Sequence, residues 1–85
     1  MYFVYMLKCA DGTIYTGYTI NLRRRLECHN SGKASKYTRS RLPVECVYTE
    51  KLCDKSAALR REKALKKLSH LQKEALIANF QETFL

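Results

Sequence analysis

The sequence lacks the features that mark secreted, membrane-spanning or multidomain proteins. Its four cysteines include no C-x-x-C pair and no secretory segment precedes them, so a disulfide framework is not expected. No apolar run approaches the roughly eighteen residues that a membrane span needs. Internal repeats and low-complexity segments are missing as well. Because 85 residues leave room for only one core, we expect a single domain over residues 1–85, soluble and cytoplasmic.

The cysteines are Cys9, Cys28, Cys46 and Cys53. We interpret them as reduced and mostly buried thiols. A zinc site that combines some of them with His29 or His70 stays open as an alternative, although adjacent Cys28 and His29 would point to different sides of a helix.

Positive charge dominates the composition. Sixteen lysines and arginines stand against eight acidic residues, which gives a formal net charge of +8. A charge of this size on a small domain indicates polyanionic partners, because cations release counterions from a polyanion and steer its approach. A charge that serves only solubility is the alternative, and composition does not decide between the two.

Periodicity and capping residues predict the element order β-β-α-β-α-α. Strands are predicted over residues 2–9, 14–18 and 44–52. Helices are predicted from an Asn21 cap to about Asn30, over residues 56–68 after an Asp54 cap, and from a Ser69–Gln72 capping box through Phe80. The basic stretch 32–43 has no period and is predicted to be a loop. We therefore expect an α+β fold in which a small three-stranded antiparallel sheet is flanked by three helices.

The first hairpin determines whether two tyrosines share one face of the sheet. In an antiparallel pair of strands, the numbers of opposed residues add up to a constant. A two-residue turn would pair Ala10 with Thr13, which makes this constant odd and puts Tyr5 and Tyr15 on opposite faces. A three-residue loop over residues 11–13 with a bulge would pair Ala10 with Ile14 and bring both phenols to one side. We predict the loop of odd length.

Two polar side chains lie on the apolar stripe of the first helix. Leu22 and Leu26 define that stripe, and Arg25 and His29 lie on or beside it, one turn apart. Burying such groups costs free energy unless a partner satisfies them. They are candidates for a site, but Arg25 could also extend past the core to solvent, and His29 could be a structural histidine.

An acid interrupts the apolar face of the following helix. Ala58, Leu65 and Leu68 mark this face, and Glu62 falls between them at a spacing that continues it. The carboxylate is therefore a second candidate for function. A structural salt bridge between Glu62 and Arg25 is the alternative.

These residues resemble the signature of the GIY-YIG family over nearly the whole chain. The matching positions are Phe3-Val4-Tyr5 and Tyr15-Thr16-Gly17 for the two triplets, Arg25 and His29 for the signature helix, and Glu62 for the metal ligand. The chain is most similar to small stand-alone bacterial members and to the nuclease domain of the excision-repair incision enzyme. It departs from the pattern in Phe3 and Val4, and in Tyr18, where some active relatives have lysine. Asn79 is a candidate for a late asparagine of the family.

The resemblance implies metal-assisted hydrolysis of phosphodiesters. Glu62 would hold one Mg²⁺ or Mn²⁺, and Arg25 would clamp the scissile phosphate. Tyr15 would act as general base or orient the water, Tyr5 would assist through a hydrogen bond, and His29 would relay the proton or fix a water. A phenol with a pKa near ~10 needs a neighbouring cation to serve as a base at neutral pH.

Candidate nucleic-acid contacts are Arg24, Lys33, Lys36, Tyr37, Arg39 and Arg41. Cations interleaved with an aromatic residue are typical of surfaces that follow a phosphate backbone, although solvated loops can have the same composition. The expected function is a DNA endonuclease with little sequence specificity, since the chain has no length for a domain that reads bases. The alternatives are a nucleic-acid-binding module without turnover and an unrelated scaffolding role.

Overall fold

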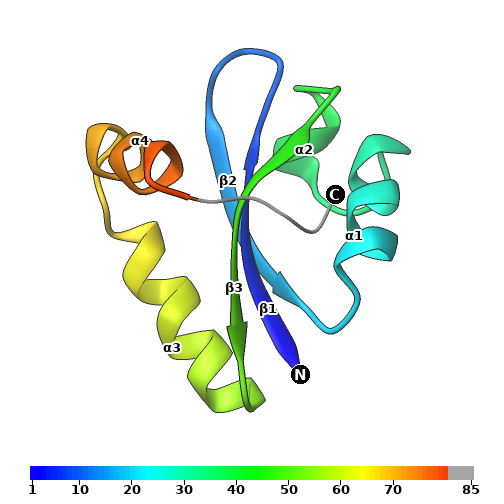
Figure 1. Cartoon of the computed structure of the whole chain (residues 1–85). Helices are drawn as coiled ribbons and strands as arrows, with labels where there is room; N and C mark the ends of the chain where they lie inside the picture. Colours follow the sequence, from blue (N-terminus) through cyan, green and yellow to red (C-terminus); the bar gives the residue numbers. More distant parts are fainter. Residues whose placement is uncertain (81–85) are drawn as a thin grey trace.

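A three-stranded antiparallel sheet organises the computed structural model, which describes residues 1–80. The elements are β1 (Tyr2–Lys8), β2 (Ile14–Thr19), α1 (Leu22–Asn30), α2 (Lys36–Arg39), β3 (Glu45–Leu52), α3 (Lys55–Lys66) and α4 (His70–Ala78). The strand order is β2-β1-β3, so β1 is central and β2 forms one edge (Figure 1). The predicted α+β class and the three antiparallel strands are confirmed.

The short helix α2 was not expected, because it lies within the stretch predicted to be a loop. Ser35 caps it by accepting a hydrogen bond from the Tyr37 N–H, at 3.1 Å. The described residues therefore contain four helices where three were predicted. The four residues of α2 span about one turn and have no apolar period, so periodicity could not indicate this helix.

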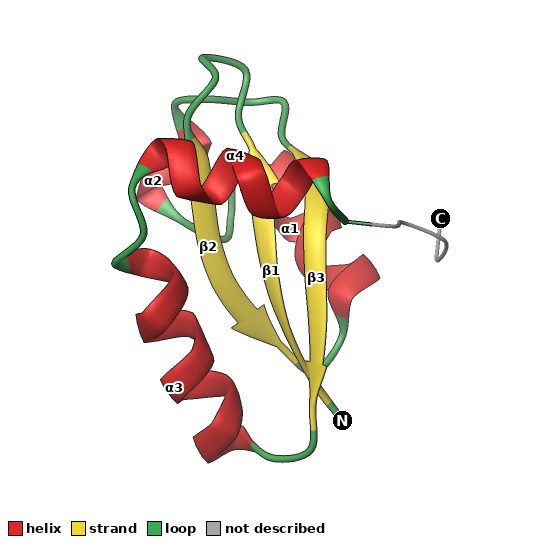
Figure 2. Ribbon diagram, turned by 60° about the vertical axis from the view of Figure 1, so that its left-hand side comes forward, coloured by secondary structure: helices red, strands yellow, loops and turns green. Residues whose placement is uncertain are grey.

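Side chains along β1 point alternately to the two faces of the sheet, and each face is covered by its own layer of helices. Val4 and Met6 point into a cluster with Ala58 and Leu65 of α3. Residues of odd number, among them Tyr5, point to the other face and pack against the apolar side of α1. As a result α3 and α4 cover one face of the sheet, and α1 and α2 cover the other (Figure 2).

The hairpin has a loop of odd length, as predicted, but its pairing differs from the prediction. Lys8 pairs with Ile14, which leaves residues 9–13 as the loop and keeps Tyr5 and Tyr15 on one face. The predicted pairing of Ala10 with Ile14 is wrong. The Ala10 N–H donates instead to the carbonyl oxygen of Arg41, at 2.9 Å, which holds Ala10 away from the ladder.

The helix caps follow the sequence predictions. The side chains of Asn21 and Asp54 accept hydrogen bonds from the first turns of α1 and α3, and Ser69 and Gln72 form a capping box at α4. The last helix ends at Ala78, before the predicted Phe80. No helix among residues 1–80 is both long and apolar enough to cross a membrane.

No disulfide joins the four cysteines, all of which lie within the described residues. Cys9 and Cys46 are buried, Cys28 is half-buried, and Cys53 is exposed. Within the described part of the chain no three His, Cys, Asp or Glu side chains are grouped so that they could hold a metal ion. The zinc alternative therefore finds no support in the arrangement of these residues.

Candidate active site

Gly17 makes room for the phenol of Tyr5 at the middle of β2. The two residues face each other across the β1–β2 ladder. A Cβ at position 17 would stand 2.7 Å from the Tyr5 hydroxyl oxygen and 2.8 Å from its Cζ, which is too close for any side chain. The second triplet, Tyr15-Thr16-Gly17, thus ends in glycine because the ring of Tyr5 lies against the backbone of residue 17.

His29 lies behind Tyr5 and is almost completely buried, with 1% of its surface exposed. Its Nε2 is 2.9 Å from the Tyr5 hydroxyl oxygen, and its Nδ1 is 2.9 Å from Oγ1 of Thr38 on α2. Burial, and then the positive charge of Arg25, lower the pKa of His29. The imidazole is therefore neutral at pH 7, with one nitrogen that donates and one that accepts.

The direction of this hydrogen-bond chain follows from its far end. The Thr38 hydroxyl lies 3.4 Å from the carbonyl oxygen of Ser35, to which it can only donate, so it accepts from Nδ1–H of His29. Nε2 is then the acceptor for the Tyr5 O–H. Burial and the nearby Tyr15 raise the pKa of Tyr5, which keeps its proton at neutral pH. Its proton points to the histidine, and its oxygen lone pairs remain available on the other side.

A hollow of about 370 Å³ opens beside Tyr5 at the β2 edge of the sheet, and we call it the edge hollow. Its lining includes Tyr5, Tyr15, Gly17, Arg25, Lys55 and Glu62. Arg25 reaches it from α1 on one face of the sheet, and Glu62 reaches it from α3 on the other. The edge of a single strand thus brings together a cation and an acid from opposite layers.

Glu62 is mostly buried, with 14% of its side chain exposed. Within residues 1–80 its ion pair is with Lys66, one turn further along α3, at 3.2 Å between Nζ and Oε2. It forms none with Arg25, so the alternative of a structural salt bridge between these two residues is wrong. Glu62 also lines the edge hollow.

Tyr15 lines the same hollow. The ring centroids of Tyr5 and Tyr15 are 6.4 Å apart, and the hydrogen bond of Tyr5 is formed with His29. The Tyr15 hydroxyl has no hydrogen-bond partner within the described residues. It is therefore free to bind a ligand or a water in the hollow.

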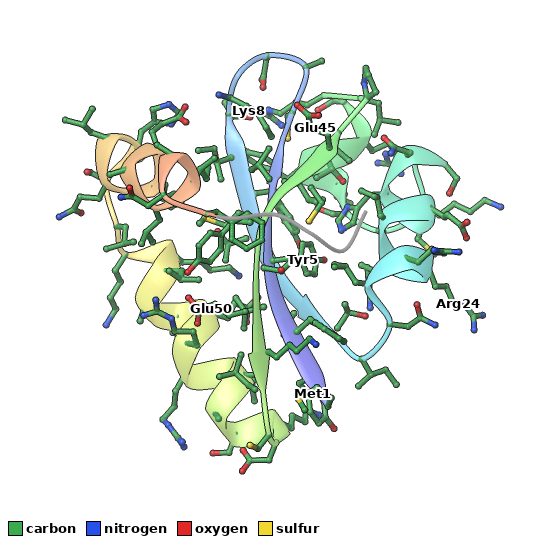
Figure 3. All side chains as sticks on the ribbon, viewed as in Figure 1. Met1, Tyr5, Lys8, Arg24, Glu45 and Glu50 are labelled. Atoms are coloured by element: carbon green, nitrogen blue, oxygen red, sulfur yellow. The ribbon has the colours of Figure 1, made fainter. Side chains whose placement is uncertain are left out.

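The predicted nucleic-acid contacts divide into two groups. The exposed ones are Arg24, Lys33, Lys36, Tyr37 and Arg39. Arg24 projects outward from α1 (Figure 3), and the ring of Tyr37 lies next to that of Tyr15, at 5.9 Å between centroids.

Arg41 belongs to the second group, because it is bound within the fold. Its Nε pairs with the Asp11 carboxylate at 2.9 Å, and its guanidinium stacks over the Tyr37 ring at 4.0 Å. A further N–H donates to the Tyr37 carbonyl oxygen, at 2.8 Å. Arg41 thus holds α2 against the hairpin loop.

Thr38 and Lys55 are site residues that sequence reasoning missed. Thr38 lies on the unpredicted helix α2, and so nothing in the sequence indicated its contact with His29. Lys55 lines the edge hollow and precedes Glu62 by seven positions, a spacing that places both on one face of α3 and could have revealed it. Asn79, the candidate late asparagine, lies outside the edge hollow, at the end of α4, where its Nδ2 donates to the Ala75 carbonyl.

Comparison with known proteins identifies the family and the fold of this chain. A UPF0213 protein of Natronomonas pharaonis is 53% identical over 78 residues, which are 92% of each chain. The solution structure of a UPF0213 protein from Bacillus halodurans is 46% identical and superposes with a TM-score of 0.59 over 92% of this chain and 84% of that one. A second solution structure, of a protein from E. faecalis, is 41% identical, with a TM-score of 0.62 over 99% and 92%. The model of the GIY-YIG catalytic domain matches residues 1–75. The chain belongs to the GIY-YIG family, whose nuclease-type domain accounts for residues 1–75.

Proposed function

We propose that this protein is a metal-dependent endonuclease that hydrolyses phosphodiester bonds, in DNA rather than RNA, with little sequence specificity. The observation that carries the proposal is the edge hollow. Tyr5, Tyr15, Arg25 and Glu62 line it together, and His29 is hydrogen-bonded to Tyr5 from behind. Residues from three separate parts of the chain thus supply the groups that phosphodiester hydrolysis requires.

Arg25 is the group that binds the scissile phosphate. In-line attack places extra negative charge on the phosphoryl oxygens, and a fixed guanidinium stabilises it through two parallel hydrogen bonds. Lys55 lines the same hollow and adds a second cation. Both cations come from helices anchored to the sheet, so they need little reorganisation when the charge develops.

Glu62 is the residue that would hold the metal. A single mostly buried carboxylate fits Mg²⁺ or Mn²⁺, whose remaining ligands are water and phosphate oxygens, and does not fit zinc, which needs three or four protein ligands. When bound, such an ion neutralises charge on the phosphate and lowers the pKa of water. Glu62 would contribute by lining the hollow, where its carboxylate oxygens can serve as ligands.

Tyr5 and His29 accept the proton of the attacking water. A phenol alone is a weak base, but the neutral imidazole behind it can take a proton. As the water gives its proton to the Tyr5 oxygen, the Tyr5 proton moves to Nε2 of His29, so that no free phenolate is needed. Tyr15, whose hydroxyl has no partner within residues 1–80, orients the water.

A basic surface beside the hollow would bind the nucleic-acid backbone. Arg24, Lys36 and Arg39 are exposed, and Tyr37 continues the aromatic row from Tyr15. Contacts of this kind position the backbone without reading its sequence, which accounts for the proposed low specificity.

Cleavage of supercoiled plasmid tests the proposal. With Mg²⁺ or Mn²⁺ the wild-type protein should give nicked and linear products. Arg25→Ala and Glu62→Gln should lower the rate by roughly a hundredfold to a thousandfold, the range for the loss of one group that stabilises the transition state. Glu27→Gln, an exposed acid on α1, is the matched control and should cleave normally. Cleavage that both site variants retain would contradict the proposal.

A nucleic-acid-binding module without turnover is the second candidate. It is favoured by Tyr18, which lines the edge hollow at a position where some active relatives have lysine. Salt-sensitive binding without cleavage under any metal condition would select this candidate.

A further inference from the structure

An apolar groove lies next to the edge hollow, on the α1 face of the sheet. It is lined by Phe3, Ile20, Asn21, Leu22, Thr49 and Lys51, and its volume is about 400 Å³. Phe3 of β1 pairs with Lys51 of β3 in the sheet register. Ile20, in the turn between β2 and α1, leaves 68% of its surface exposed. At this exposure Ile20 buries little surface in the core, and most of its side chain is accessible to a ligand.

Ile20 connects this groove with the proposed catalytic site. It lines the apolar groove, the edge hollow, and a third hollow that Arg24 and Arg25 also line. A ligand held by Arg25 in the edge hollow is thus separated from the groove by one side chain. A nucleotide spans such a separation, because its base is joined to its phosphate through a single sugar.

The charges around Ile20 determine which occupant fits. Across the three hollows it shares walls with Arg24, Arg25, Lys51 and Lys55, against one acid, Glu62. An apolar surface ringed by cations repels a second copy of a chain whose net charge is +8, and it attracts a polyanion that carries flat apolar groups. Nucleic acid has this combination.

We propose that the apolar groove binds one unpaired nucleobase of the strand whose phosphate lies in the edge hollow. This inference rests on the proposed nuclease function and names its substrate class. The Phe3 ring and Ile20 supply the apolar and stacking contacts, while Lys51 and Arg24 bind the flanking phosphates. A base enters the groove only after leaving its helical stack, which costs least in single strands, mismatches and junctions. Single-stranded or distorted nucleic acid is therefore the preferred substrate.

Binding of two labelled oligonucleotides of equal length and charge tests this inference without relying on cleavage. One is oligothymidylate and the other is the same backbone with abasic residues throughout, and binding is followed by fluorescence anisotropy. The wild-type protein should bind oligothymidylate at least about fivefold more tightly, the lower end of what stacking one base contributes. Ile20→Ser should remove most of this difference. Leu71→Ser is the matched control, since Leu71 is an isolated side chain on α4 that is 80% exposed.

Phe3→Leu keeps the groove apolar but removes the ring, and should lower the preference for oligothymidylate in the same direction. Equal affinity of the wild-type protein for the two oligonucleotides, or an unchanged preference in Ile20→Ser, would overturn the inference. Self-association of the free protein that Ile20→Ser abolishes would assign the groove to a second copy and overturn it as well. A preference for oligothymidylate without cleavage would support the groove proposal and contradict only the nuclease function. Cleavage without that preference would support the nuclease function and contradict only the groove proposal.

Discussion

Tyr5 and Gly17 meet across the β1–β2 ladder at a distance that excludes even a methyl group on residue 17. Gly17→Ala should therefore displace the Tyr5 phenol from His29, destabilise the fold by about 1–3 kcal/mol through overpacking, and abolish most cleavage. Chemical denaturation and plasmid cleavage measure the two effects. Gly12→Ala is the control: it strains a turn with φ of 86° but meets no atom within 4 Å, so it should lower stability and leave cleavage intact. A Gly17→Ala protein with normal activity would show that the position of the phenol is unimportant.

Thr38 should determine which nitrogen of His29 carries the proton. Thr38→Val removes the acceptor for Nδ1–H and leaves a buried donor unpaired, which costs about 1–3 kcal/mol or moves the proton to Nε2. In the second case Nε2 no longer accepts from Tyr5. Cleavage should fall by roughly tenfold to a hundredfold, as when other groups that orient a histidine are removed.

Thr38→Ser keeps the hydroxyl and should restore both the tautomer and the activity. Nitrogen chemical shifts of the His29 ring, measured by NMR at neutral pH, report the tautomer independently of cleavage. If Thr38→Val and the wild-type protein have the same tautomer, Thr38 is a packing residue and nothing more.

Stability should depend on pH through His29. Its pKa in the folded state lies below the ordinary value of 6.5, because burial and then Arg25 disfavour the imidazolium. Below about pH 6.5 the unfolded chain therefore binds a proton that the folded chain does not. The stability that His29 contributes is complete above this pH and is lost progressively as the pH falls toward the folded-state pKa.

Urea denaturation from about pH 8 down to pH 5 measures this slope. His29→Gln should flatten it, whereas His70→Gln changes an exposed imidazole that has no contact with Tyr5 and serves as the control. An equal slope in the wild-type protein and in His29→Gln would show that another group titrates.

Arg41 should contribute to the scaffold and not to phosphate binding. Its guanidinium is engaged with Asp11 and Tyr37, so Arg41→Gln and Asp11→Asn should lower the thermal midpoint to a similar extent. Lys36→Gln, by contrast, should weaken DNA binding and reduce the salt dependence of binding by about one counterion. A loss of about one counterion in Arg41→Gln, with no change in stability, would assign Arg41 to the backbone contact instead.

The sequence predicted the features that depend on neighbouring residues. Alternation gave the three strands, and Asn21, Asp54 and Ser69 marked the starts of three helices correctly. The shared parity of Tyr5 and Tyr15 placed both phenols on one face. Each of these signals acts within a few residues or along one ladder, where local geometry leaves few choices.

The features that the sequence did not predict depend on contacts between distant segments. Helix α2 is too short to show a period, and it is held in place by the contact of Thr38 with His29 and by Arg41, which bonds to both Tyr37 and Asp11. Parity placed Tyr5 and Tyr15 on one face, but it could not show that Tyr5 would bond to His29, 24 positions away, and not to Tyr15. That Arg25 and Glu62 share one hollow followed from the family resemblance and not from periodicity, because it depends on how two layers meet at the edge of β2.

The two-layer origin of the edge hollow has a consequence for synthesis of the chain. A growing polypeptide exposes Tyr5, Tyr15, Arg25 and His29 well before residue 62 leaves the ribosome. The central strand β1 gains its second neighbour only when β3 has emerged, and α3 follows β3. The carboxylate therefore arrives last, so a chain that terminates before residue 62 lacks the residue proposed to hold the metal.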